Sequence, residues 1–116
     1  MITQPRRLAA IKLAERVAAE LGEAVGERVG YSIRGKSKAR RFITKLLFVT
    51  TGWLLHKLIA QPPFIKSVTH LILDEIHVRS SEADMLCLII KKLAKQYQRR
   101  PRLIITSANF DTGNPR

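Results

Sequence analysis

The spacing of apolar residues predicts a long helix near the start of the chain. Apolar positions recur at intervals of three and four after Pro5, and Gly22 stops the pattern, so we expect an amphipathic helix over residues 5–21. Pro5 suits the first turn of a helix, where its missing N–H costs nothing. The predicted apolar face comprises Leu8, Ile11, Ala14, Val17, Ala18 and Leu21.

The rest of the chain alternates between short apolar runs and helical patterns. The expected strands are Val29 to Ile33, Leu46 to Thr50, Val68 to Leu73 and Leu103 to Thr106. The expected helices are Trp53 to Ala60, which Pro62 ends, and a helix opened by Ser81-x-x-Asp84 that runs to about Tyr97. Strands that alternate with helices predict crossover connections in an α/β fold, and near-continuous apolar strands predict a parallel sheet covered on both faces.

Polar residues follow three of these strands. Thr50-Thr51-Gly52, Asp74-Glu75 and Ser107-Ala108-Asn109 each stand at the carboxyl end of a predicted strand. Ligands of parallel sheets bind at that edge, so we expect these segments to form one site.

The acidic pair after a strand is typical of a nucleotide-triphosphate site. Asp74 is expected to hold Mg²⁺, because hard cations prefer carboxylate oxygens, and Glu75 to activate the attacking water. His77 would lie at the rim. The alternative is an acidic turn or a helix N-terminus, which also favours acids. His70 and His77 have no third neighbour at a spacing that suits a metal site of their own.

Residues Gly30 to Ser37 fit the phosphate-loop pattern G-x-x-x-x-G-K-[ST]. Such a loop needs a buried strand before it and a helix after it. The preceding residues include Glu23 and Glu27, and the loop itself would contain strand-forming Tyr31 and Ile33. We therefore interpret the match as a coincidence. The remaining alternative is a small P-loop NTPase that uses Lys36 and Asp74.

Charge and composition narrow the choice of partner. The net charge is +12, and no Asp or Glu occurs from Arg28 to Leu73, which predicts a phosphate-facing surface. A non-enzymatic basic module that binds nucleic acid through residues 28–66 is therefore a second hypothesis. The longest apolar run, Met85 to Ile90, has six residues, so we expect no membrane span. The single cysteine, Cys87, excludes an internal disulfide and suits an intracellular location, cytoplasmic or nuclear.

Four motifs occur in an order that resembles the DEAH/DExH-box family of ATP-dependent RNA helicases. They are Thr3-Gln4-Pro5-Arg6-Arg7, Thr50-Thr51-Gly52, Asp74-Glu75-Ile76-His77 and Ser107-Ala108-Asn109. The second motif of one subgroup reads Asp-Glu-Ile-His, as here. The resemblance covers nearly the whole chain and implies a RecA-like fold, ATP hydrolysis and RNA as partner.

The resemblance also implies a role for each motif. The backbone of single-stranded RNA would be held by the first two motifs, through Thr3, Gln4, Arg6, Arg7, Thr50, Thr51 and Gly52. ATP and Mg²⁺ would be bound by Asp74, Glu75, Ser107 and Asn109, with Asp74 and Glu75 at the metal. Glu75 and His77 would be catalytic: Glu75 would activate water, and His77 would link the nucleotide site to the Ser-Ala-Asn segment.

The chain departs from the family pattern in several places. Val78 and Asn109 stand where the family usually has Glu and Thr. The family's phosphate-binding loop lies upstream of the first motif, and its second RecA-like domain, which follows, is not in this sequence. We therefore expect residues 1–116 to be the C-terminal portion of the ATP-binding domain, with a sheet incomplete at the N-terminus. Alone, the chain is expected to bind RNA weakly and to hydrolyse little or no ATP.

Overall fold

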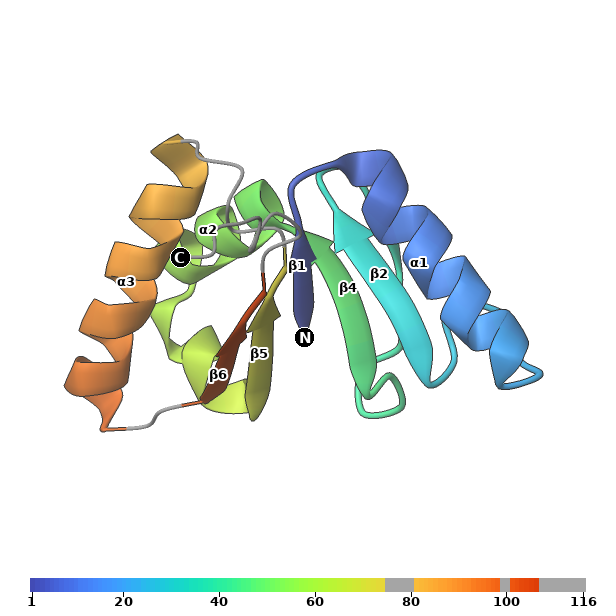
Figure 1. The fold of residues 1–116 in the computed structure, drawn as a ribbon. Helices are drawn as coiled ribbons and strands as arrows, with labels where there is room; N and C mark the ends of the chain where they lie inside the picture. Colours follow the sequence, from blue (N-terminus) through green and yellow to red (C-terminus); the bar gives the residue numbers. More distant parts are fainter. Residues whose placement is uncertain (75–80, 99–100, 107–116) are drawn as a thin grey trace, which may run out of the picture.

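The computed structural model describes residues 1–74, 81–98 and 101–106. Within these residues, one six-stranded sheet has the order β3-β2-β4-β1-β5-β6 (Figure 1). All strand pairs are parallel except that between β2 and β3. This arrangement confirms the predicted α/β class with a largely parallel sheet. The strands are β1 (Ile2–Gln4), β2 (Val29–Ile33), β3 (Lys36–Lys38), β4 (Leu46–Thr50), β5 (His70–Leu73) and β6 (Arg102–Ile105).

Helices cover both faces of the sheet (Figure 1). Helix α1 (Arg7–Glu20) lies on one face, and α2 (Thr51–Ala60), α3 (Ser81–Tyr97) and the 3₁₀ helix η1 (Pro62–Ser67) lie on the other. The strand order explains the division. The chain passes from β1 to β2 in one direction and from β4 through β5 to β6 in the opposite one, and right-handed crossovers then place the helices on opposite faces.

Two hydrophobic clusters hold these layers together. One joins α2, η1 and α3 to the sheet through side chains such as Leu58, Ile65 and Leu86. The other lies between α1 and strands β2 and β4. The neighbours Phe48 and Val49 on β4 belong to different clusters, because successive side chains of a strand point to opposite faces. A strand buried on both faces thus needs a continuous apolar run.

The buried face of α1 matches the predicted one in part. Ala10, Ala14 and Ala18 are the fully buried residues, whereas Leu8 and Leu21 are 68% and 48% exposed. A stripe of alanines lets the helix backbone lie close to β2 and β4, and the larger side chains then sit at the flanks of the contact. The predicted face is confirmed at Ala14 and Ala18 and at the partly buried Ile11 and Val17, and it was wrong at Leu8 and Leu21, because apolar spacing alone does not say which apolar residues pack closest.

The central strand β1 was not predicted. Ile2–Gln4 lies between β4 and β5, and α1 begins only at Arg7. Three residues, two of them polar, are too few to show a strand pattern. Thr3 and Gln4 are nevertheless only 2% and 1% exposed, because strands pair on both sides of them and helices cover both faces.

Residues that matched the phosphate-loop pattern form a β-hairpin. Gly30 lies in β2, Gly35 makes the turn with φ +78°, and Ser32 pairs with Ser37 across the two strands. A phosphate loop requires a strand, a loop and then a helix, so the P-loop NTPase hypothesis based on Lys36 is wrong. Strand β3 was missed because Lys-Ser-Lys is polar; charged residues of this kind suit the edge of a sheet.

The remaining predicted elements are confirmed, with boundaries shifted by one or two residues. Helix α2 begins at Thr51 rather than Trp53, and β5 begins at His70 rather than Val68. Within the described residues, no helix has the length and apolar content needed to cross a bilayer.

Candidate functional site

The carboxyl ends of the parallel strands bring several predicted site residues together. Gln4 pairs with Thr50 in the β1–β4 register, and Thr3 pairs with Leu73, directly before Asp74. Leu73 in turn pairs with Ile105, so Thr106 follows at the same edge. This confirms that the strand ends converge, as the sequence pattern predicted.

Asp74 is held by two neutral donors at this edge. The amide Nε2 of Gln4 donates a hydrogen bond of 2.6 Å to Oδ2, and the hydroxyl of Thr106 donates to Oδ1. Both donors are uncharged, so they orient the carboxylate without neutralising its charge. A half-buried carboxylate at a strand end is the kind of ligand that Mg²⁺ takes, directly or through water.

Strand β1 also connects Asp74 to the start of α2. The Thr51 hydroxyl donates to the Gln4 carbonyl oxygen over 3.4 Å. The Thr50 hydroxyl accepts a 3.2 Å hydrogen bond from the Trp53 backbone N–H and thereby caps α2. Gln4 therefore contacts Asp74 through its side chain and the Thr51 segment through its backbone.

An open cavity of about 520 Å³ lies beside these strand ends. The Arg7 side chain reaches it from the start of α1 and donates to the Arg34 carbonyl oxygen over 2.9 Å. Arg34 stands in the hairpin turn after β2, so two arginines from segments far apart in sequence line the cavity. The cavity is lined by Pro5, Arg7, Arg34, Thr50, Gly52, Trp53, His56 and Glu82.

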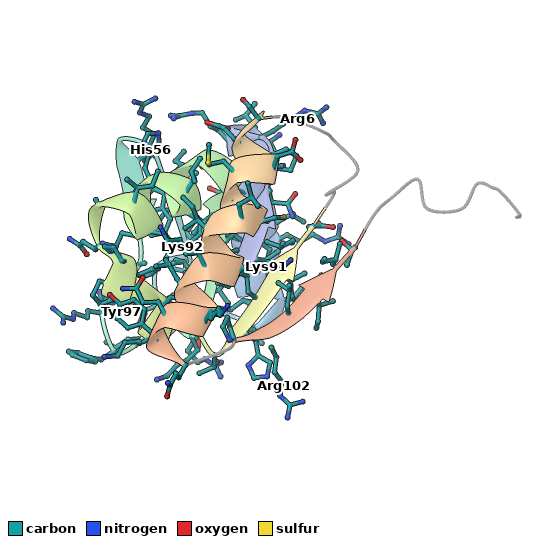
Figure 2. The ribbon with its side chains drawn as sticks, turned by 90° about the vertical axis from the view of Figure 1, so that its left-hand side faces the viewer. Arg6, His56, Lys91, Lys92, Tyr97 and Arg102 are labelled. Atoms are coloured by element: carbon teal, nitrogen blue, oxygen red, sulfur yellow. The ribbon has the colours of Figure 1, made fainter. Side chains whose placement is uncertain are left out.

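The cavity is suited to a polyanion on chemical grounds. Arg7 and Arg34 can donate to phosphate oxygens, and the first turn of α2 presents the positive end of its helix dipole. Arg6 is exposed just before α1, and Figure 2 shows it at the same end of the molecule as His56. Figure 2 also places Arg102 and Tyr97 at the opposite end.

The predicted RNA-contacting residues divide into surface and interior groups. Arg7 and Gly52 line the cavity, Arg6 is exposed, and Thr51 is partly exposed. Thr3 and Gln4 are enclosed in the sheet, and Thr50 touches the cavity but is only 8% exposed, with its hydroxyl engaged as the helix cap. The interior residues thus form the framework that carries the exposed ones.

Sequence reasoning missed Trp53, His56 and Glu82 as cavity residues. It included Arg34 only as part of the segment from Arg28 to Leu73, which contains no Asp or Glu. The period of α2 places His56 one turn after Gly52, so the helix pattern held a signal for that residue. No comparable signal pointed to Glu82, because its position depends on how α3 packs against α2.

Four predicted site residues lie outside the described residues. They are Glu75, His77, Ser107 and Asn109. Within the part of the chain that the structure describes, no group of three or more His, Cys, Asp or Glu side chains could hold a metal ion.

Comparison with known proteins identifies relatives in one family, although no family model matches the chain. The chain is 50% identical over 111 residues to the DExH-box ATP-dependent RNA helicase DExH1 of Arabidopsis thaliana. It is 45% identical, also over 111 residues, to the putative ATP-dependent RNA helicase DHX57 of Mus musculus. These matches cover 94% and 96% of the chain but only 11% and 8% of the relatives.

The fold comparison agrees. The crystal structure of the E. coli DExH-box NTPase HrpB superimposes with a TM-score of 0.85 at 35% identity, over 96% of this chain and 14% of that one. The resemblance to DExH-box RNA helicases and the RecA-like α/β fold are therefore confirmed. This chain corresponds to a segment that spans about a tenth of its relatives' length.

Proposed function

We propose that this chain forms the C-terminal portion of the first RecA-like domain of an ATP-dependent RNA helicase, and that its cavity binds the backbone of single-stranded RNA. One observation carries the proposal: Arg7, Arg34 and the start of α2 line one cavity, and strand β1 joins that cavity to Asp74. The kinship with RNA helicases supports RNA as the polyanion.

Within this proposal, each group has a distinct task. Arg6, Arg7 and Arg34 neutralise phosphates, while backbone N–H groups of the first turn of α2, which begins at Thr51, donate hydrogen bonds. Thr3, Gln4 and Thr50 hold these donors in place from the interior. Such contacts position the strand without reading its sequence.

The ATP-dependent roles rest on the family relationship. Asp74, with Glu75, would hold the Mg²⁺ of Mg²⁺-ATP, which supplies charge neutralisation at the phosphates. Glu75 would orient and deprotonate water, and His77 would connect this site to Ser107 and Asn109. Gln4 and Thr106 keep the Asp74 carboxylate in one orientation. The remaining helicase domains are partners that this chain needs for turnover.

RNA binding is tested by fluorescence anisotropy with a labelled single-stranded RNA at several salt concentrations. We expect Arg7→Gln to weaken binding about threefold to tenfold and to make the salt dependence shallower, with a slope change of about 0.7 for each lost phosphate contact. Arg102→Gln, at the opposite end of the molecule, is the matched control. Equal losses in both variants would contradict a localised site.

Catalysis is tested separately by phosphate release from ATP with and without RNA. We expect the chain alone to release little or no phosphate. Clear RNA-stimulated turnover that disappears in Glu75→Gln would show that these residues suffice for hydrolysis and would overturn the partial-domain assignment.

The basic-module hypothesis is favoured by one feature, the exposed cations of β3 and the loop that follows. Two basic residues of the segment 28–66 are, however, paired with acids that precede it: Arg28 with Glu23 at 2.5 Å and Arg40 with Glu27 at 3.8 Å. These ion pairs reduce the charge available to a ligand. RNA binding that depends on Lys36 and Lys38 but not on Arg7 would support this second function.

A further inference from the structure

The cationic cavity contains a carboxylate that the RNA-binding proposal does not use. Glu82 lies in the first turn of α3 and is the one acidic residue among the described residues that line the cavity. The carboxylate rests against Gly52, the second residue of α2. A Cβ atom placed on Gly52 would lie 2.9 Å from Oε2 and 3.3 Å from Oε1 of Glu82.

This position is the one that a phosphate would favour. The start of α2 carries partial positive charge, because the N–H groups of a first turn have no partners within the helix, and Arg7 and Arg34 line the same cavity. Because Gly52 has no side chain, an anion can approach the helix backbone closely there. In this structure the approaching anion is the Glu82 carboxylate.

We propose that Glu82 is an internal competitor for an RNA phosphate at the start of α2, and that it sets the affinity of the cavity for RNA. The inference rests on the proposed RNA-binding function and adds a residue that opposes binding. A phosphate entering beside Gly52 must displace the carboxylate. Residue Glu82 is exposed, so its side chain can change rotamer and leave Gly52 without unfolding α3.

A purely structural role for Glu82 makes a different prediction. Acidic residues in a first turn stabilise their own helix, and both Glu82 and Asp84 occupy the first turn of α3. Asp84 is exposed, does not line the cavity, and lies close enough to Cys87 to influence that thiol. Asp84→Asn is thus a matched control: it removes the same charge from the same helical turn, away from Gly52.

The experiment measures binding of a labelled single-stranded oligouridylate to the full chain by anisotropy, as a function of salt. We expect Glu82→Gln to bind roughly threefold to tenfold more tightly at low salt, with a salt slope steeper by about 0.7, the amount for one additional phosphate contact. Asp84→Asn should change affinity less than twofold and leave the slope as it is. Glu82→Asp keeps an acid in the first turn but shortens it, so it should also strengthen binding.

Each remaining outcome overturns the inference. Equal gains in Glu82→Gln and Asp84→Asn would show a general effect of net charge, and weaker binding by Glu82→Gln would show that the carboxylate assists RNA. Both results leave the proposed function intact if Arg7→Gln still weakens binding. If Arg7→Gln has no effect, the RNA-binding function fails and the inference fails with it. Circular dichroism melting curves identify any variant whose folding has changed.

Discussion

The hydrogen bond between Gln4 and Asp74 allows a quantitative test of how the site is built. Gln4 is 1% exposed, and its amide lies 2.6 Å from a half-buried carboxylate. Gln4→Leu removes the donor and keeps a side chain of similar size. A hydrogen bond to a charged group contributes about 1.5–3 kcal/mol, whereas a neutral one contributes about 1 kcal/mol.

The expected loss in Gln4→Leu is about 1–2 kcal/mol in the free energy of unfolding, because the apolar replacement offsets part of the lost bond. Asp74→Asn keeps the shape of the acceptor and removes its charge. In a double-mutant cycle the two changes should therefore be coupled by about 1 kcal/mol or more. Asp74 also accepts a hydrogen bond from the Thr106 hydroxyl. Asp74→Asn should therefore lower the free energy of unfolding by more than the coupling energy with Gln4.

Urea denaturation followed by circular dichroism provides the four free energies. Gln96→Leu is the control, because Gln96 is exposed on α3 and should show no coupling to Asp74. A Gln4–Asp74 coupling below about 0.5 kcal/mol, the usual limit of additivity, would refute the reasoning. The carboxylate would then be oriented by Thr106 and the strand end without help from Gln4.

Three further predictions concern packing and reactivity. Gly30→Ala should lower the free energy of unfolding by about 1–3 kcal/mol in urea denaturation, because the added Cβ would collide with the backbone carbonyl of Lys38. Unchanged stability would show that the hairpin can shift to make room. Leu58→Ala, at a site 1% exposed, should cost about 2–5 kcal/mol by the same assay, and a cost below 1 kcal/mol would mean that the core collapses around the gap. Cys87 is exposed at the surface, but partial burial of its thiol, with a smaller contribution from Asp84, raises the thiol pKa, so less thiolate exists at pH 8 than in free cysteine and alkylation by iodoacetamide should be slower than that of free cysteine. Asp84→Asn should speed that alkylation, as followed by mass spectrometry, and an unchanged rate would leave burial as the only cause.

The placement of Gln4 explains why a strand of three residues matters to the site. Its side chain donates to Asp74 and its carbonyl oxygen accepts from Thr51. One buried residue of the Thr3–Arg7 motif therefore contacts both the Thr50-Thr51-Gly52 motif and the motif that begins at Asp74. Arg6 and Arg7 follow directly on the same chain segment. A displacement of β1 would therefore affect phosphate contacts and the carboxylate together.

Most of the fold was predictable from sequence because its signals are local. Short runs rich in apolar residues identified β2, β4 and β5, and periodic apolar positions, with Gly22 and Pro62 as stops, identified the helices. The convergence of Thr50, Asp74 and Thr106 at one edge also followed from sequence, because parallel strands share their carboxyl ends.

Tertiary structure alone decided the features that depend on non-local contacts. Strand β1 exists because β4 and β5 flank it, not because Ile-Thr-Gln prefers a strand. The partners of Asp74 and the packing of Glu82 against Gly52 join residues 30 or more positions apart, and no local pattern encodes such pairs. The sequence by itself thus determined the elements and the edge where the site lies, whereas the side-chain geometry of that site came from packing.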